Sequence, residues 1–126
     1  MKTLSITIAA VLAGVALGAT GSEALRAQVP PPAFVVGEIE VENAPAYFKE
    51  YVPVAAQAVV DGGGKYIVRN GRSVSLYGAP PKALAIMQFE SLAKAQAAFA
   101  SKAYTDAKAI GDKYAKFRIY AVEGLP

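Results

Sequence analysis

The side chains of this sequence that can do chemistry are carboxylates, cations and phenols, because the chain contains no Cys and no His. Their absence excludes thiolate nucleophiles, imidazole bases and disulfides. Two charged residues stand out: Arg69, which ends a short apolar run, and Glu38, which lies within another. Arg69 can hold a carboxylate by bidentate pairing, and a desolvated Glu38 can transfer a proton. The alternative is a structural role, with the two side chains paired to each other or facing water.

Tyrosine is the second candidate group, with seven residues in the chain. Tyr47 and Tyr51 are one helical turn apart and would share a helix face. With Tyr66, Tyr77 and Tyr104 they can line one pocket, where phenol hydroxyls would orient a small aromatic ligand. The alternative is an ordinary amphipathic core. The candidate ligand-binding residues are therefore Glu38, Tyr47, Tyr51, Arg69 and Tyr104.

Other kinds of site are not indicated. Gly62-Gly63-Gly64 follows a predicted helix and lacks the Lys-Ser/Thr of a phosphate loop, so it is interpreted as a helix stop. The carboxylates form no dense cluster, and we expect neither a metal nor another cofactor. The basic residues are scattered and the net charge is only +3. This balance does not favour nucleic acid as a partner.

Hydrophobic periodicity predicts the elements that must position these residues. Strands are expected at residues 33–41, 65–69, 82–89 and 116–122, with a shorter one at 73–77 after the Asn70-Gly71 turn. The first helix follows Asn43, has Pro45 in its first turn and is kinked by Pro53. Ser91 and Ser101 are the expected caps of the later helices.

The order β-α-β-β-α-β predicts an α+β protein of the ferredoxin-like class, a four-stranded antiparallel sheet with both helices on one face. The other face carries Phe34 and Val36 and has no helix to cover it. An uncovered apolar sheet face predicts a partner. We expect a homodimer through this face.

The first 27 residues have the pattern of a secretory signal peptide. Lys2 precedes an apolar run, and small residues crowd its end. Cleavage is expected after Ala27, with Ala24 also acceptable, followed by a Pro-rich leader at 28–32 and the domain at 33–124. The alternative is an uncleaved membrane anchor, since the uncharged run is about 20 residues long. Cleavage leaves no membrane anchor, and the mature protein is expected to be periplasmic or secreted.

The ordered set of motifs resembles the domain-of-unknown-function 1330 family of the dimeric α/β-barrel superfamily. The matching pieces are VVGEIEV from Val35, the Tyr47 and Tyr51 pair, GGGKYIVR ending at Arg69, and the final Val122-Glu123-Gly124. The resemblance implies a ferredoxin-like fold and a dimer in which two sheets pack into a barrel. Several polar family positions differ, such as Asp61 where His is common and Tyr77 where Glu is common.

Two functions follow as hypotheses. The first is an exported, non-enzymatic homodimer that binds a small apolar or aromatic molecule. The second is a cofactor-independent isomerase or monooxygenase that uses Glu38, Arg69 and a tyrosine. A pocket that holds all three side chains would favour the enzyme, whereas a barrel filled with side chains would favour the binding protein.

Overall fold

The computed structural model describes residues 29–126. The expected signal peptide and its cleavage site lie outside these residues. No helix in the described part of the chain is both long enough and apolar enough to cross a membrane.

A four-stranded sheet forms one layer of the domain. Its strands are β1 (Ala33–Val41), β2 (Lys65–Arg69), β3 (Ala83–Phe89) and β4 (Ala115–Glu123), in the order β2-β3-β1-β4 with every neighbouring pair antiparallel. In β1, alternate residues from Ala33 to Ile39 are buried, and those between them are more exposed. This period of two separates a helix-facing side from an open side, as the sequence predicts.

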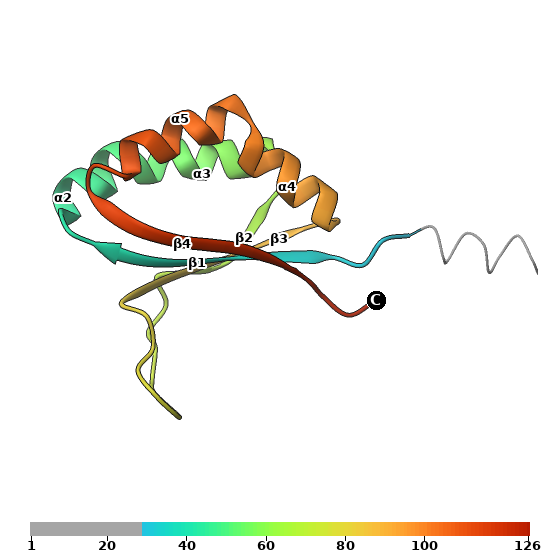
Figure 1. Cartoon of the computed structure of the whole chain (residues 1–126), viewed down its shortest axis with the longest axis horizontal. Coiled ribbons are helices and arrows are strands. Elements are labelled where there is room, and N and C mark those ends of the chain that lie inside the picture. The colour runs from blue at the N-terminus through green and yellow to red at the C-terminus, as the bar shows by residue number, and fades with distance from the viewer. Residues whose placement is uncertain (1–28) are drawn as a thin grey trace, which may run out of the picture. The chain divides into compact units, whose positions relative to one another are not determined.

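The helices all cover the same side of the sheet (Figure 1). They are α2 (Ala44–Ala46), the π-helical turn η1 (Tyr47–Tyr51), α3 (Val52–Asp61), α4 (Leu92–Ala100) and α5 (Lys102–Gly111). The predicted caps are confirmed: the side chains of Asn43, Ser91 and Ser101 accept hydrogen bonds from the first turns of α2, α4 and α5. The ferredoxin-like α+β fold is thus confirmed.

Pro53 disturbs the first helix in the predicted place. Pro53 has no N–H to donate to the preceding turn. Just before it, the N–H of Val52 donates to the carbonyl of Tyr47, five residues back. The helix is therefore wider over η1, and the tyrosines at the two ends of this turn are both buried against the sheet.

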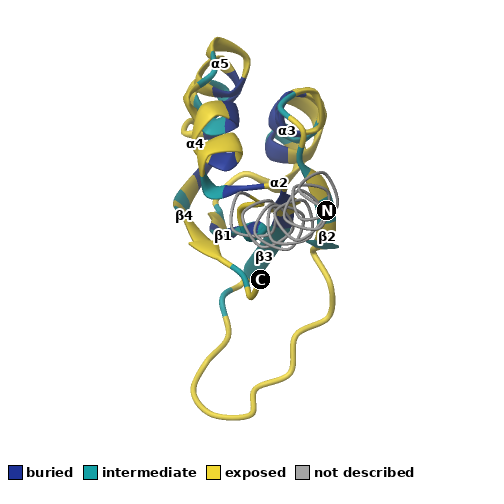
Figure 2. Ribbon diagram, turned by 90° about the vertical axis from the view of Figure 1, so that its right-hand side faces the viewer, coloured by how far each residue is buried: buried dark blue, intermediate teal, exposed yellow. Residues whose placement is uncertain are grey.

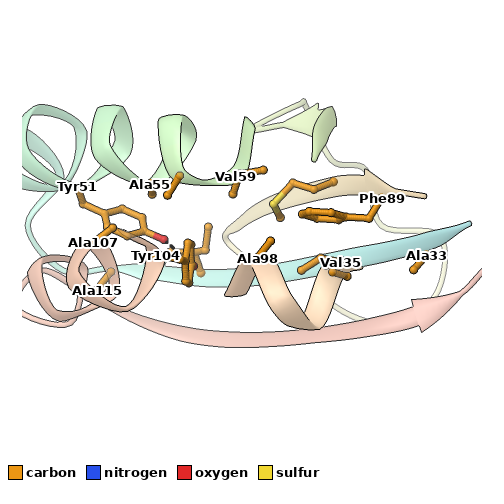
Figure 3. Packing of buried hydrophobic residues seen from close by; sticks show 14 of the residues in the cluster. Ala33, Val35, Tyr51, Ala55, Val59, Phe89, Ala98, Tyr104, Ala107 and Ala115 are labelled. Carbon is orange, nitrogen blue, oxygen red and sulfur yellow. Dashed lines mark hydrogen bonds between the residues drawn. The ribbon is translucent and has the colours of Figure 1, made fainter. Parts of the chain in front are cut away.

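The core fills the space between the sheet and the helices (Figures 2 and 3). Phe89, Val35 and Val59 are its largest fully buried side chains. Around them the helices contribute mostly alanine, which lets α3, α4 and α5 approach the sheet closely while the tyrosines fill the end near η1.

One predicted element is wrong. Residues 73–77 form no strand, and β2 pairs directly with β3. The segment from Asn70 to Lys82, which we call the β2–β3 loop, begins with Asn70 in a left-handed conformation, at φ 52°. Its run from Asn70 to Pro80 is exposed throughout. The short apolar alternation at 73–77 resembles a strand, but this segment pairs with no strand of the sheet.

Candidate functional site

A cavity of about 50 Å³ lies between the sheet and the first helix. The side chains around it come from β1, β2, β3, β4, η1, α3 and α5, and they are mainly apolar and aromatic. The lining includes Gly37, Tyr47, Tyr51, Tyr66, Arg69, Asn70, Ala85 and Tyr104. The structure thus brings four of the five predicted candidates, Tyr47, Tyr51, Arg69 and Tyr104, around one space.

Tyr51 and Tyr104 form the polar centre of this group. Their hydroxyl oxygens are 3.1 Å apart in a buried hydrogen bond, although the residues are 53 positions apart in sequence. Figure 3 shows the Tyr51 ring from the first helix pointing toward Tyr104 on α5. The ring of Tyr47 lies 5.1 Å from that of Tyr51, centroid to centroid. Three phenols therefore pack together at one end of the core.

Burial keeps these phenols protonated. Desolvation raises the pKa of Tyr47 to about 12, with Tyr104 and Tyr66 adding to the effect and the Arg69 cation opposing it. Burial also raises the pKa of Tyr51, Tyr66 and Tyr104. At neutral pH the cluster consequently offers hydroxyl donors and acceptors but no phenolate base.

Arg69 supplies the positive charge of the site. It is the last residue of β2, and its guanidinium carbon lies 5.0 Å from the centre of the Tyr66 ring, a cation–π contact. Arg69 is exposed, whereas the phenols behind it are largely buried. The guanidinium therefore lies on the solvent side of the cavity, where it can meet an anionic group.

Gly37 was not among the predicted site residues. It lies in the middle of β1, between Ala85 of β3 and Ile119 of β4, and it lines the cavity. A Cβ added at Gly37 would have only the Ala85 carbonyl oxygen, at 3.8 Å, within 4 Å, so the space above it is open. A glycine inside a strand is the sequence signal for open space of this kind beside the backbone.

Glu38 lies on the opposite side of the sheet from Arg69. It alternates with the helix-facing Gly37 and Ile39, and its carboxylate is 4.0 Å from the Arg118 guanidinium on β4. Arg69 lies opposite Ala85 on the helix-facing side, because a β-bulge follows Tyr66. A pairing of Glu38 with Arg69, one of the alternatives for these two charges, is therefore not formed. Tyr77 is also not in the pocket, since it is fully exposed on the β2–β3 loop.

The cavity can bind but has few means of catalysis. Its lining contains hydroxyls, one guanidinium and one amide, and no carboxylate among the described residues. No group of three acidic residues that could hold a metal ion occurs within residues 29–126. Among the described lining residues, the groups that could take part in proton transfer are thus phenols.

Comparison with solved structures supports the fold. The methylated RPA0582 protein of Rhodopseudomonas palustris has a TM-score of 0.60 and 16% identity, with 85% of this chain and 91% of that chain covered. SnoaB, a cofactor-independent oxygenase from Streptomyces nogalater, has a TM-score of 0.56 and 11% identity, with 76% and 95% covered. An ethyl tert-butyl ether D family protein from Bacillus halodurans has a TM-score of 0.52 and 14% identity, with 75% and 99% covered.

Identities this low show a shared fold, that of the ferredoxin-like dimeric α/β-barrel proteins, and no shared activity. No curated protein sequence matches this chain. A family model, Domain of unknown function (DUF1330), matches residues 32–125, which include every helix and strand described above. This chain belongs to the DUF1330 family.

Proposed function

We propose that this protein is an exported, non-enzymatic homodimer that binds a small aromatic molecule in the cavity below Arg69. The observation that carries the proposal is the set of four protonated phenols and one guanidinium around a space that no described carboxylate enters. Such a lining can pack against an aromatic ring, while the guanidinium and the hydroxyls bind a negative or hydrogen-bond-accepting group on that ring.

The size of the cavity limits the ligand. A volume of about 50 Å³ is far below the ~300–1,000 Å³ of drug-sized ligand pockets. A single ring can enter only where side chains at the mouth move outward, and Arg69 and Asn70 are the exposed lining residues that can do so. The proposed ligand class is accordingly a single ring with one acidic group.

Saturation-transfer NMR with benzoate, phenol and toluene as probes tests this proposal. We expect benzoate to bind best, because it alone brings a full negative charge to Arg69. Arg69→Met should weaken benzoate at least about tenfold and leave toluene unchanged, the effect of losing a charge-assisted hydrogen bond. Arg118→Met is the matched control, since this guanidinium lies on the opposite sheet face beside Glu38.

A second variant tests whether the probe enters the cavity itself. Gly37→Ala adds a methyl group to the open space between Ala85 and Ile119 without a close contact. Binding of every probe should fall while the melting temperature is maintained. Equal binding of benzoate by the wild type, Arg69→Met and Gly37→Ala would contradict the proposed function.

The homodimer part of the proposal is supported by the open sheet face. Phe34, Val36, Tyr120 and Val122 share this side of β1 and β4, where the register pairs Phe34 with Val122 and Val36 with Tyr120. Tyr120 and Val122 are 45% and 51% exposed. A second copy would cover these apolar side chains, as in an isologous two-fold interface.

A further inference from the structure

We infer that the β2–β3 loop is an arm that packs against the second copy of the chain, an inference that rests on the proposed homodimer. The loop presents three apolar side chains within four residues. Val74, Leu76 and Tyr77 are 67%, 86% and 101% exposed. Single exposed apolar residues are ordinary, but a cluster on one projecting segment marks a binding surface.

The direction of the loop identifies what it can contact. In Figures 1 and 2 the loop leaves the sheet on the side opposite the helices and extends well beyond it. Its conformation is fixed locally by the Ser75 hydroxyl, which donates to the Gly78 carbonyl, by Gly78 at φ 75°, and by Pro80 and Pro81. Anything that covers the open sheet face must therefore meet a shaped, apolar loop at its side.

The charges of the open face favour a second copy as the occupant. Glu38 and Glu40 on β1 lie directly across from Arg118 and Lys116 on β4. This end of the face thus carries an acidic column beside a basic column. A two-fold related copy can place its acidic column on the basic one, so the surface is complementary to itself.

The loop would enlarge the surface that a second copy can cover. Four strands about 4.8 Å apart and at most nine residues long make a face of roughly 20 Å by 30 Å, or about 600 Å². A stable interface takes about 800 Å² from each partner. Tyr77 alone can bury roughly 150–250 Å², so the loop would add appreciably to the area that the sheet contributes.

The loop and the face also form one continuous concave surface. A hollow of about 340 Å³ lies where they meet. Pro80, Pro81 and Lys82 form its loop side, and residues 38–40 of β1 and 116–118 of β4 form its sheet side. A partner that sits on the charged end of the sheet would contact both walls of this hollow.

Sedimentation velocity at a series of protein concentrations tests the arm. Leu76→Ser with Tyr77→Ser should weaken the dimer at least tenfold, because both side chains are exposed in the protomer and would be buried by the partner. Val60→Ser, on the outer side of α3 and 56% exposed, is the control and should not change dimerisation. Val36→Glu on the open face should abolish the dimer.

These variants separate the arm from the dimer proposal. A monomeric wild type would overturn both, whereas a dimer that Val36→Glu breaks and the loop variant leaves unchanged would overturn only the arm. Photocrosslinking tests the contact directly. The photoreactive residue p-benzoylphenylalanine replaces Tyr77, and a mixture of isotopically light and heavy protein is irradiated so that crosslinks between two copies can be recognised. We expect mixed-isotope crosslinks to strands β1 or β4; crosslinks confined to one isotope would contradict the arm.

Discussion

At the scale of single residues, the site depends on one long-range contact between phenols. Tyr51 and Tyr104 come from different helices, and each hydroxyl satisfies the other in a buried place. The hydrogen bond stabilises the fold and holds both rings toward the sheet. Its loss is costly, because the free-energy penalty of leaving a buried hydroxyl unpaired exceeds the net contribution of one hydrogen bond.

A double-mutant cycle measures this contact. Tyr51→Phe and Tyr104→Phe should each lower the free energy of unfolding by about 1–2 kcal/mol, since each leaves the other hydroxyl unpaired. The double variant should lower the free energy of unfolding by clearly less than the sum of the two single effects. Urea denaturation of the four proteins gives the values, and strict additivity would show that the hydroxyls do not interact.

The raised pKa of Tyr47 predicts alkaline destabilisation. The unfolded phenol loses its proton near pH 10, whereas the folded one keeps it up to about pH 12. Unfolding therefore releases the Tyr47 proton in this window, so the contribution of Tyr47 to stability is constant below pH 10 and is lost from pH 10 to 12.

Melting temperatures of the wild type and Tyr47→Phe from pH 8 to 12 test this expectation. The variant should lose less stability above pH 10, because the phenyl ring that replaces the phenol has no proton to release. All other ionisable residues are common to both proteins, so the difference between the two curves reports the effect of Tyr47. Parallel curves across the whole range would contradict the role of Tyr47.

At the scale of elements, the packing of α5 on the first helix depends on Gly111. A Cβ at this position would lie 2.6 Å from Cδ2 of Tyr51 and 2.9 Å from Cζ of Phe117. Glycine is a poor helix former, so Gly111 weakens α5 as a local element. The structure shows that it also makes room for the ring of Tyr51.

Gly111→Ala is therefore expected to destabilise the protein by about 1–3 kcal/mol, the range for an overpacked core, in spite of the better helix propensity of alanine. Gly37→Ala is the matched control, because its added Cβ is in ordinary van der Waals contact at 3.8 Å. Thermal unfolding compares the two. A Gly111→Ala variant as stable as Gly37→Ala would show that Tyr51 moves aside without cost.

At the scale of the whole molecule, the open sheet face connects stability with assembly. If the native state is a dimer, dilution favours the unfolded monomer, and the melting temperature rises with protein concentration. We expect this dependence for the wild type and a weaker one for Val36→Glu. A melting temperature that is constant over a hundredfold range of concentration would indicate a folded monomer.

The sequence alone determined the elements and their order. Alternation in β1 and β4, the caps Asn43, Ser91 and Ser101, and the glycines after Asp61 are local signals, since each acts through neighbours in the chain. The α+β class follows from these signals by the rules of chain connection. Tyr47 and Tyr51 of the cavity were also identifiable as a pair, because their spacing puts them on one helix face.

Only the tertiary structure decided which of these residues meet. A β-bulge between Tyr66 and Val68 places Arg69 opposite Ala85 on the helix-facing side of the sheet. Alternation along β1 places Glu38 on the open side, where it lies beside Arg118. The segment at 73–77 has a strand-like pattern, yet it extends from the sheet as a loop that connects the paired strands β2 and β3. Contacts between distant segments depend on sheet order and register, which short-range periodicity does not encode.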